Sequence, residues 1–259
     1  MPSYVIGDVH GCLDGIFSLL EAIEYNPKND YLYFLGDLVN KGPDSIGVLS
    51  WIMKQKNCKS VIGNHDLFLI HSIVNQTSNP SDTTKSFLTK TDAIDWLCQQ
   101  PFIIEHQNTL MCHAGIHPKW TDQNISDIVK EQMTFITAEQ LKRFYHQPRW
   151  QLKAMYNDPL FIMAVLTEMR FLDPINFTLS QGTNDNDPLD QERIAWFDVK
   201  SMNHTKKDIL FGHWAKLSTV KNHHTTCLDG GFVYGGTLLC QRLDDGKIFK
   251  IKHPKQRNV

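Results

Sequence analysis

Near its start the chain reads Tyr4-Val5-Ile6-Gly7-Asp8-Val9-His10-Gly11, an apolar run that stops at a glycine and continues with an acidic residue and a histidine. Residues 3–6 predict a buried strand, and the two glycines predict a tight turn. Helical periodicity follows directly. A strand, a turn and a helix in this order are typical of α/β folds, which build their sites where strands end.

The same arrangement recurs at four more places. Each time a short apolar run stops at Gly or Cys and is followed by a residue type that binds metals. The four blocks are Phe34-Leu35-Gly36-Asp37, Val61-Ile62-Gly63-Asn64-His65-Asp66, Leu110-Met111-Cys112-His113-Ala114-Gly115 and Ile209-Leu210-Phe211-Gly212-His213. A single Gly-Asp pair is usually only a turn, but five ordered blocks indicate oxygen and imidazole ligands that gather at one sheet edge.

The overall composition is that of an ordinary soluble globular protein. The chain has 259 residues, of which 41% are hydrophobic and 21% charged, enough for a substantial core. Its formal net charge of -2 gives no reason to expect nucleic acid or an acidic membrane as partner. The six cysteines are scattered without a CxxC pair and predict reduced thiols in a cytoplasmic protein. We expect no signal peptide before the first strand, and no apolar stretch approaches the roughly 18 residues of a membrane span.

The pattern changes near Pro118. From there to about residue 200 the sequence shows helical periodicity and aromatic residues, without a further block of glycine plus ligand. The strand-rich pattern returns at residues 209–211. We therefore expect a single domain over residues 1–259, interrupted by a mostly helical insertion at about 118–200.

The ligand types suit two divalent metals. Asp37 is the natural bridge because a carboxylate has two oxygens, and Asp8 and His10 lie two apart on one turn and can converge on the first metal. The second metal would take its remaining ligands from Asn64, His113 and His213. Mixed oxygen and nitrogen ligation suits Mn²⁺ or Co²⁺, with Fe²⁺ or Zn²⁺ as alternatives. Metals ~3.5–4 Å apart can share a hydroxide and stabilise in-line displacement at phosphorus.

Other residues fit the same chemistry. His65 and Asp66 follow the ligand Asn64, and an imidazole held by a carboxylate can protonate a leaving oxygen. Lys41, four residues after Asp37, and Arg170 in the insertion are candidate phosphate-binding residues. An ion-pair role fits Arg170 equally well.

Some assignments have alternatives. His213 is the weakest ligand taken singly, and His223 or His224 could take its place. Among the other histidines, His117 is expected nearest the pocket. Asp229, before two glycines, fits a site loop or a simple turn. Four tryptophans could stack a base, although core packing is the commoner role; they are Trp120, Trp150, Trp196 and Trp214.

The motif series resembles that of the phosphoprotein-phosphatase branch of the calcineurin-like metallophosphoesterases. The matching motifs are Gly7-Asp8-Val9-His10-Gly11, Gly36-Asp37-Leu38-Val39-Asn40-Lys41-Gly42, Gly63-Asn64-His65-Asp66 and His113-Ala114-Gly115. Within this branch the chain is most similar to the bacterial symmetrical dinucleoside tetraphosphatases. That similarity is carried by Gly63-Asn64-His65-Asp66-Leu67, Met169-Arg170-Phe171, Phe211-Gly212-His213-Trp214-Ala215 and Leu228-Asp229-Gly230. The resemblance extends over nearly the whole chain.

The resemblance implies a four-layer α/β/β/α sandwich with a dimetal site at the strand ends, held by the six ligands named above. It implies that His65, oriented by Asp66, is the general acid. The implied reaction is hydrolysis of diadenosine tetraphosphate into two ADP, by attack of a metal-bound hydroxide on phosphorus. The insertion could hold one nucleoside diphosphate half so that the central bond is the one cleaved.

The chain departs from the usual protein-phosphatase loop at one place. Asn40-Lys41 replaces an Asp-Arg pair, and lysine keeps the charge but loses the bidentate fork, which argues against a phosphoprotein substrate. Ala215 stands where many related metallophosphoesterases carry a second histidine, as fits the phosphoprotein-phosphatase branch. The alternative function is a phosphoprotein or phosphomonoester phosphatase with the same centre. A non-catalytic nucleotide-binding module is a rival that has no need of His65 as an acid. We expect a monomer without a membrane partner, and nucleoside-capped RNA ends are a candidate second substrate.

Overall fold

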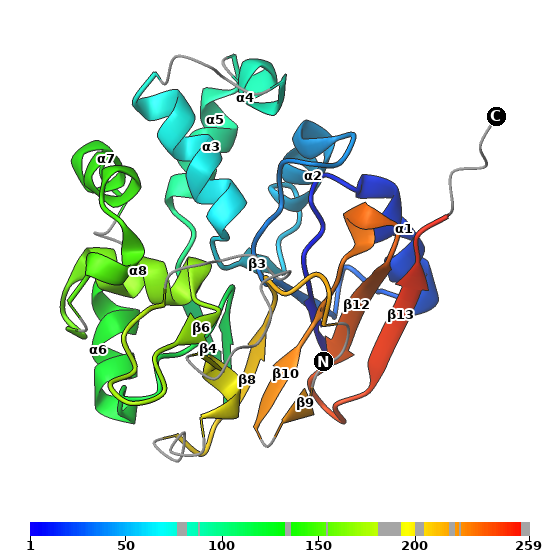
Figure 1. Ribbon diagram of the computed structural model, residues 1–259. Coiled ribbons are helices and arrows are strands. Elements are labelled where there is room, and N and C mark those ends of the chain that lie inside the picture. The colour runs from blue at the N-terminus through cyan, green and yellow to red at the C-terminus, as the bar shows by residue number, and fades with distance from the viewer. Residues whose placement is uncertain are drawn as a thin grey trace.

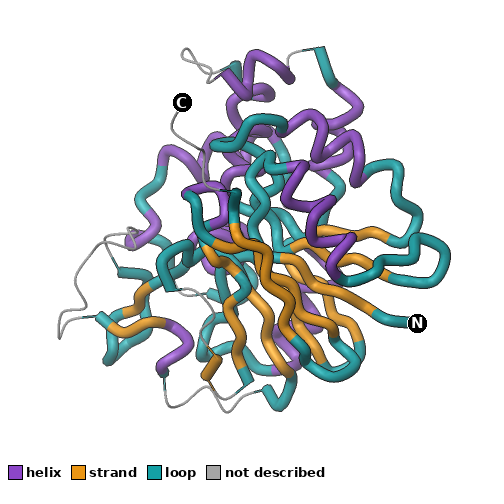
Figure 2. Tube along the Cα trace, turned by 90° about the vertical axis from the view of Figure 1, so that its right-hand side faces the viewer, coloured by secondary structure: helices purple, strands orange, loops and turns teal. Residues whose placement is uncertain are grey.

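The structure, a computed structural model, consists of two β-sheets packed face to face between layers of helices (Figure 1). It describes residues 1–76, 82–87, 89–132, 136–153, 155–180, 193–199, 205–217, 221–222 and 224–254. Figure 2 shows the strands as one block through the molecule, with most of the helices above it. The predicted four-layer α/β/β/α sandwich is confirmed.

The first sheet has the strand order β11-β12-β1-β2-β3, with β13 paired to β12. Its strands are β1 (Ser3–Ile6), β2 (Tyr31–Phe34), β3 (Cys58–Ser60), β11 (Asp229–Gly230), β12 (Thr237–Arg242) and β13 (Ile248–Lys252). The strands β1, β2 and β3 are parallel, with Ile6 opposite Phe34 and Phe34 opposite Ser60. Their carboxyl ends therefore lie at the same edge of the sheet.

The second sheet has the order β4-β5-β8-β10-β9. Its strands are β4 (Ile103–His106), β5 (Thr109–Cys112), β8 (Asp208–Phe211), β9 (Lys221–Asn222) and β10 (Thr225–Cys227). The strands β5, β8 and β10 are parallel, with Leu110 opposite Ile209 and Ile209 opposite Thr225. Residues 112–113 and 211–213 consequently leave the sheet at one edge.

Strand residues alternate between two apolar layers, as the two-residue period of a strand requires. One set fills the space between the sheets: Val5, Tyr33, Leu35, Met111, Leu210, Leu228 and Leu239. The alternate residues of β1 and β2 belong to the layer that also contains helix residues: Tyr4, Ile6, Leu32 and Phe34. Burial on both faces explains why these strands read as continuous apolar runs.

In the first half of the chain, the described residues form five helices: α1 (Leu13–Ala22), α2 (Ser45–Ile52), α3 (Asn64–Val74), α4 (Asp82–Phe87) and α5 (Thr91–Cys98). Helix α1 buries Ile16 and Leu19 and packs on β12 and β13. The Asp44 side chain caps α2 by accepting a hydrogen bond from the Gly47 N–H at 2.7 Å. Helix α3 packs against α4, α5 and a helix of the expected insertion (Figure 1).

Between residues 118 and 200, the part that the structure describes forms three α-helices and a small sheet: α6 (Asp122–Glu131), α7 (Ala138–His146), α8 (Pro159–Glu168), β6 (Phe171–Leu172) and β7 (Ile194–Ala195). Short 3₁₀ helices are η2 (Arg149–Gln151), η3 (Trp196–Asp198) and, near the C-terminus, η4 (Phe232–Tyr234). Helix α8 is buried along almost its whole length, and its Leu166 carbonyl accepts a bond from the Ala114 N–H at 2.8 Å. This part of the expected insertion therefore belongs to the core beside β5.

Two further expectations concern the whole chain. All six cysteines are free, and four of them are buried. Within the described ranges, no helix is both long and apolar enough to cross a membrane.

Candidate metal centre

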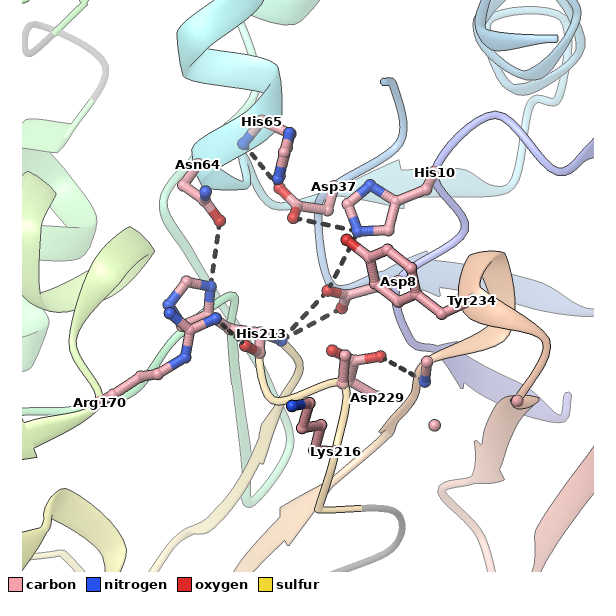
Figure 3. A pocket seen from close by; sticks show the side chains of 14 residues that line it. Asp8, His10, Asp37, Asn64, His65, Arg170, His213, Lys216, Asp229 and Tyr234 are labelled. Carbon is pink, nitrogen blue, oxygen red and sulfur yellow. Dashed lines mark hydrogen bonds and ion pairs between the residues drawn. The ribbon is translucent and has the colours of Figure 1, made fainter. Parts of the chain in front are cut away.

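The predicted ligands lie together because the strands that precede them end at one edge. Asp8 follows β1, Asp37 follows β2, and Asn64 is the first residue of α3, shortly after β3. From the second sheet, His113 follows β5 and His213 follows β8. Asp8, His10, Asp37, Asn64 and His213 line a cavity of about 490 Å³ (Figure 3). His113 is fully buried, and its ligand atom lies within 4.8 Å of those of Asp8 and Asp37.

The first group of ligands consists of Asp8, His10 and Asp37. The Nε2 atom of His10 lies 3.5 Å from Asp37 Oδ2 and 4.0 Å from Asp8 Oδ2. The Asp8 carboxylate is held in place by the backbone N–H of His213, whose nitrogen is 3.2 Å from Oδ2. One imidazole thus faces two buried carboxylates.

The second group surrounds Asn64. Its Oδ1 atom lies 2.9 Å from His113 Nε2 and 3.1 Å from His213 Nδ1. The same Nε2 of His113 is 3.5 Å from Asp37 Oδ1. Asp37 is therefore the carboxylate common to both groups, with one oxygen toward each.

The other ring nitrogen of His10, His113 and His213 is hydrogen-bonded to a backbone carbonyl. His10 Nδ1 bonds Val39 O at 3.2 Å, His113 Nδ1 bonds Leu35 O at 2.8 Å, and His213 Nε2 bonds Glu168 O at 3.3 Å. Bonds of this kind fix the tautomer of metal-binding histidines. With these tautomers, Asn64 Oδ1 faces the lone pairs of two neutral imidazoles. These acceptor atoms repel one another, and a cation bound between them would remove the repulsion.

Burial also favours the neutral form of these histidines. It lowers the pKa of His10 and His113, and it places the pKa of His213 well below its ordinary value. Burial, together with the charges of Asp229 and Asp37, raises the pKa of Asp8. Burial acts in the same direction on Asp37, but interaction with the imidazoles of His113, His65 and His10 lowers its pKa. Neutral imidazoles and buried carboxylates that face one another fit divalent metals.

The backbone at the site is held in uncommon conformations. Five non-glycine residues have left-handed φ angles: His10 (45°), Asp37 (49°), Asn40 (68°), Lys41 (68°) and His213 (69°). Each such residue stores of order 1–3 kcal/mol, and such residues cluster at functional sites. Three of the six predicted ligands are thus oriented by backbone strain that the surrounding structure maintains.

Gly212 is required by a close approach to a ligand. A Cβ atom at this position would lie 3.1 Å from Asp8 Cγ and closer still to Asp8 Oδ1. Only glycine leaves room for the carboxylate next to the His213 N–H that holds it. This explains the Gly-His pair after β8.

His65 lies at the rim of the first ligand group. Its backbone N–H donates to Asp37 Oδ1 at 2.9 Å, and its ring meets the His10 ring edge-on, with centroids 4.9 Å apart. Burial lowers its pKa, while Asp37 opposes the shift. A ring nitrogen of His65 and ligand atoms of His10 and Asp37 lie within 4.8 Å of one another. The geometry therefore admits His65 as a proton donor or as a further ligand.

Asp66 does not orient the His65 imidazole as expected. Its Oδ1 accepts bonds from the N–H groups of Leu38 (2.9 Å) and Val39 (3.2 Å), and its Oδ2 accepts one from Gly63 (3.0 Å). The reason is its place in the first turn of α3, where an acidic side chain reaches back to the N-cap backbone. Burial and the charge of Asp37 raise its pKa to about 8, against these three bonds. Asp66 thus ties together the two loops that carry Asp37 and Asn64.

The two predicted phosphate-binding residues lie in different pockets. Arg170 lines the metal cavity and donates from Nη2 to His213 O at 2.6 Å (Figure 3). Its guanidinium also lies over the Trp214 ring. Lys41 is exposed and lines a second pocket, which also includes His65.

The structure separates the alternatives for several residues. His213 lies beside Asn64 among the candidate ligands, whereas His224 is exposed beside Asp208, and His223 lies outside the described residues. The expectation that His117 lines the pocket is wrong, because it is buried and bonds Phe177 O at 2.8 Å. Three of the four tryptophans are core residues and Trp150 is half exposed; none of the four lines the described metal cavity.

Two residues of the metal cavity were not predicted from the sequence. Lys216 and Tyr234 line the metal cavity, and the Tyr234 side chain is 64% exposed. Asp229 serves both of its expected roles, since it lines the cavity and accepts a bond from the Gly231 N–H at 2.9 Å. The surrounding glycines were the available signal, because the left-handed Gly231 and Gly235 flank the turn that presents Tyr234.

Comparison with known proteins matches residues 1–215 to the calcineurin-like phosphoesterase family. The chain is 33% identical over 274 residues to the symmetrical bis(5'-nucleosyl)-tetraphosphatase of Legionella pneumophila, with 97% of each chain covered. It is 31% identical over 271 residues to the protein of the same name from Vibrio cholerae serotype O1, covering 96% of this chain and 97% of that one. A crystal structure given as a candidate diadenosine tetraphosphatase matches with a TM-score of 0.65 at 25% identity, covering 97% of this chain and 93% of the other.

Proposed function

Because this chain belongs to the calcineurin-like phosphoesterase family and is therefore a hydrolase, we propose that it cleaves diadenosine tetraphosphate symmetrically into two ADP. The observation that carries the proposal is the convergence of carboxylates, an amide and neutral imidazoles at one sheet edge, with Asp37 common to two groups. The substrate is supported by the names of relatives that match the chain over nearly its full length.

The residues present fit two divalent cations, for which we propose Mn²⁺ or Co²⁺. Asp8, His10 and Asp37 would hold one ion, and the second would be held by Asp37, Asn64, His113 and His213. When bound, the ions supply Lewis acidity toward phosphate oxygens and water.

The chain's own residues complete the chemistry. We propose that His65 gives its proton to the oxygen that leaves phosphorus, a role supported by its position at the rim beside Asp37 and His10. Arg170 in the metal cavity and Lys41 in the second pocket would offset phosphate charge on two sides of His65. Asp66 acts through the backbone, because its three accepted bonds hold the loops that carry Asp37 and Asn64.

Symmetric cleavage requires the central P–O–P bond to lie at the metal ligands. One half of the substrate must then be held at a fixed distance from them. The helical segment 118–200 reaches this region through Tyr145, Glu168 and Arg170, which line the two pockets. These contacts support the expected role of that segment in choosing the bond.

A substrate comparison tests the proposal. Protein loaded with Mn²⁺ or Co²⁺ is assayed with diadenosine tetraphosphate, a phosphoserine peptide and p-nitrophenyl phosphate. We expect the highest kcat/KM for the dinucleotide. Faster turnover of the peptide would assign the chain to the alternative, a phosphoprotein or phosphomonoester phosphatase with the same centre. No turnover of any substrate would favour a binding module.

The surroundings of the enzyme are part of the same proposal. We expect a monomer in the cytoplasm, and the free state of all six cysteines is compatible with a reducing compartment. RNA ends capped by a nucleoside polyphosphate contain the same linkage, and RNA prepared with such a cap tests whether they are also cleaved.

A further inference from the structure

A second pocket adjoins the metal cavity at His65. It has a volume of about 380 Å³ and is called the Phe68 pocket below; it is lined by Asn40, Lys41, Asn64, His65, Phe68, Tyr145 and Glu168. Asn64 and His65 line both cavities, so the two meet at the candidate metal centre. The volume falls within the range of small-molecule sites, roughly 300–1,000 Å³.

The walls of this pocket combine a rigid aromatic pair with an accessible ring. Tyr145 on α7 stacks on the buried His71, with centroids 4.3 Å apart and planes at 29°. Phe68 on α3 meets the Tyr145 ring edge-on at 6.2 Å, and its side chain is 43% exposed. Phe68 thus offers an aromatic surface to a ligand while Tyr145 is held from behind.

The charges at the rim favour an anion near the aromatic wall. Lys41 is exposed at the pocket. Glu168, the acidic residue among the lining side chains, is paired with Arg149, whose Nε lies 2.6 Å from Oε2. The ion pair reduces the repulsion that the carboxylate would otherwise exert on phosphate. The positive charge of Lys41 then attracts a phosphate at the pocket.

The Tyr145 hydroxyl is an independent indication of a ligand. It is buried and has no hydrogen-bond partner among the described residues. A buried polar group without a partner is destabilising by about 1–3 kcal/mol. Burial also raises the pKa of Tyr145 well above its ordinary value, which keeps the hydroxyl a donor at neutral pH. A ligand with an acceptor atom in the Phe68 pocket would satisfy it.

We propose that the Phe68 pocket binds one nucleoside of the dinucleoside substrate, with the base stacked on Phe68, the adjoining phosphates beside Lys41, and the Tyr145 hydroxyl donating to an acceptor of the nucleoside. This proposal rests on the proposed function. Because the pocket lies beside His65, the candidate proton donor to the leaving oxygen, the bound half is the ADP that leaves. Stacking accepts any base, so discrimination among bases at this pocket is weak.

Two variants and a matched control test the pocket. Phe68→Ala removes the stacking surface, and Tyr145→Phe removes only the hydroxyl. Phe17→Ala is the control, because Phe17 is 44% exposed, packs edge-on against Trp51 at 5.9 Å and lines neither pocket. KM and kcat are measured for diadenosine tetraphosphate and for inorganic tripolyphosphate, which carries no nucleoside.

Phe68→Ala is expected to raise KM for the dinucleotide roughly 10-fold, and KM for tripolyphosphate much less. Tyr145→Phe is expected to raise the dinucleotide KM roughly 5-fold without lowering the unfolding temperature, because the unpaired hydroxyl is lost. A purely structural role would lower that temperature and leave KM unchanged. Phe68→Trp keeps a stacking surface and is expected to stay near the wild-type KM, which also provides a test if the alanine variant folds poorly.

The wild-type products separate failure of this inference from failure of the proposed function. If wild-type protein does not release ADP from diadenosine tetraphosphate, the proposed function fails and the pocket assignment with it. If wild-type protein does so, but Phe68→Ala and Tyr145→Phe have the same KM as Phe17→Ala, only the pocket assignment is overturned.

Discussion

Replacing Gly212 by alanine is expected to displace a metal ligand while leaving the fold in place. The added Cβ would lie 3.1 Å from Asp8 Cγ and closer to Oδ1, whereas carbon atoms pack at about 3.5–4.0 Å. The carboxylate must therefore move by roughly an ångström. That movement also breaks the bond from the His213 N–H to Asp8 Oδ2, now 3.2 Å.

The size of the effect follows from this displacement. An error of about 1 Å in the position of a reacting or supporting group lowers rates by about 100-fold. Loss of a ligand's supporting contacts lowers metal affinity by about 10- to 100-fold, or about 1.4–2.7 kcal/mol. The added methyl group lowers the free energy of unfolding by about 1–3 kcal/mol, as overpacking does.

Metal affinity and stability are measured on the same samples, by equilibrium dialysis with Mn²⁺ and by urea unfolding without metal. Gly246→Ala is the control, because Gly246 has a φ of +69° and, among the described residues, the atom nearest to its Cβ would be Gln241 Nε2 at 4.0 Å. Alanine at this left-handed φ lowers the free energy of unfolding by about 1–2 kcal/mol, and the substitution does not contact the site. Wild-type metal affinity and turnover in Gly212→Ala would refute the placement of Asp8 as a ligand, and so would equal metal loss in both variants.

Three other changes have defined outcomes. Asp37→Asn is expected to lower the content of both metals and to reduce turnover at least about 100-fold, and near-normal turnover would contradict the shared role of Asp37. His65→Gln is expected to lower kcat by about 100- to 10,000-fold at unchanged metal content, whereas equal metal loss would make His65 a ligand. Burial lowers the pKa of His117 from 6.5 to about 4, so the unfolded chain binds the proton first as the pH falls. Urea unfolding should therefore show a loss of about 2 kcal/mol from this residue between pH 7 and pH 5, and His117→Gln should reduce that loss; an unchanged pH dependence would argue against it.

The sheet edge could be predicted because its signals are local. An apolar run, a glycine and a ligand such as Asp8 or His213 occupy neighbouring positions in the sequence, and parallel strands place their ends at one edge. The two faces of β1 are both buried, which a continuous apolar run indicates. The candidate ligands therefore follow from short segments of the sequence, whereas the four-layer sandwich was predicted from the resemblance to a known family.

Features that depend on contacts between distant segments were not predictable in this way. Asp66 was expected to face His65, but its carboxylate meets the backbone of residues 38–39 and of Gly63, which only the folded loops bring near. Phe68 and Tyr145 meet because α3 packs on α7, and neither helix carries a sequence motif that indicates its partner. Helices pack according to the shape of their surfaces, and sequence periodicity does not show which two helices pack together.

The most direct test of the central claim is chromatography of the products released from diadenosine tetraphosphate by metal-loaded protein. ADP as the sole nucleotide product is predicted, because the central P–O–P bond lies at the ligands when one ADP half occupies the Phe68 pocket. ATP together with AMP would contradict symmetric cleavage.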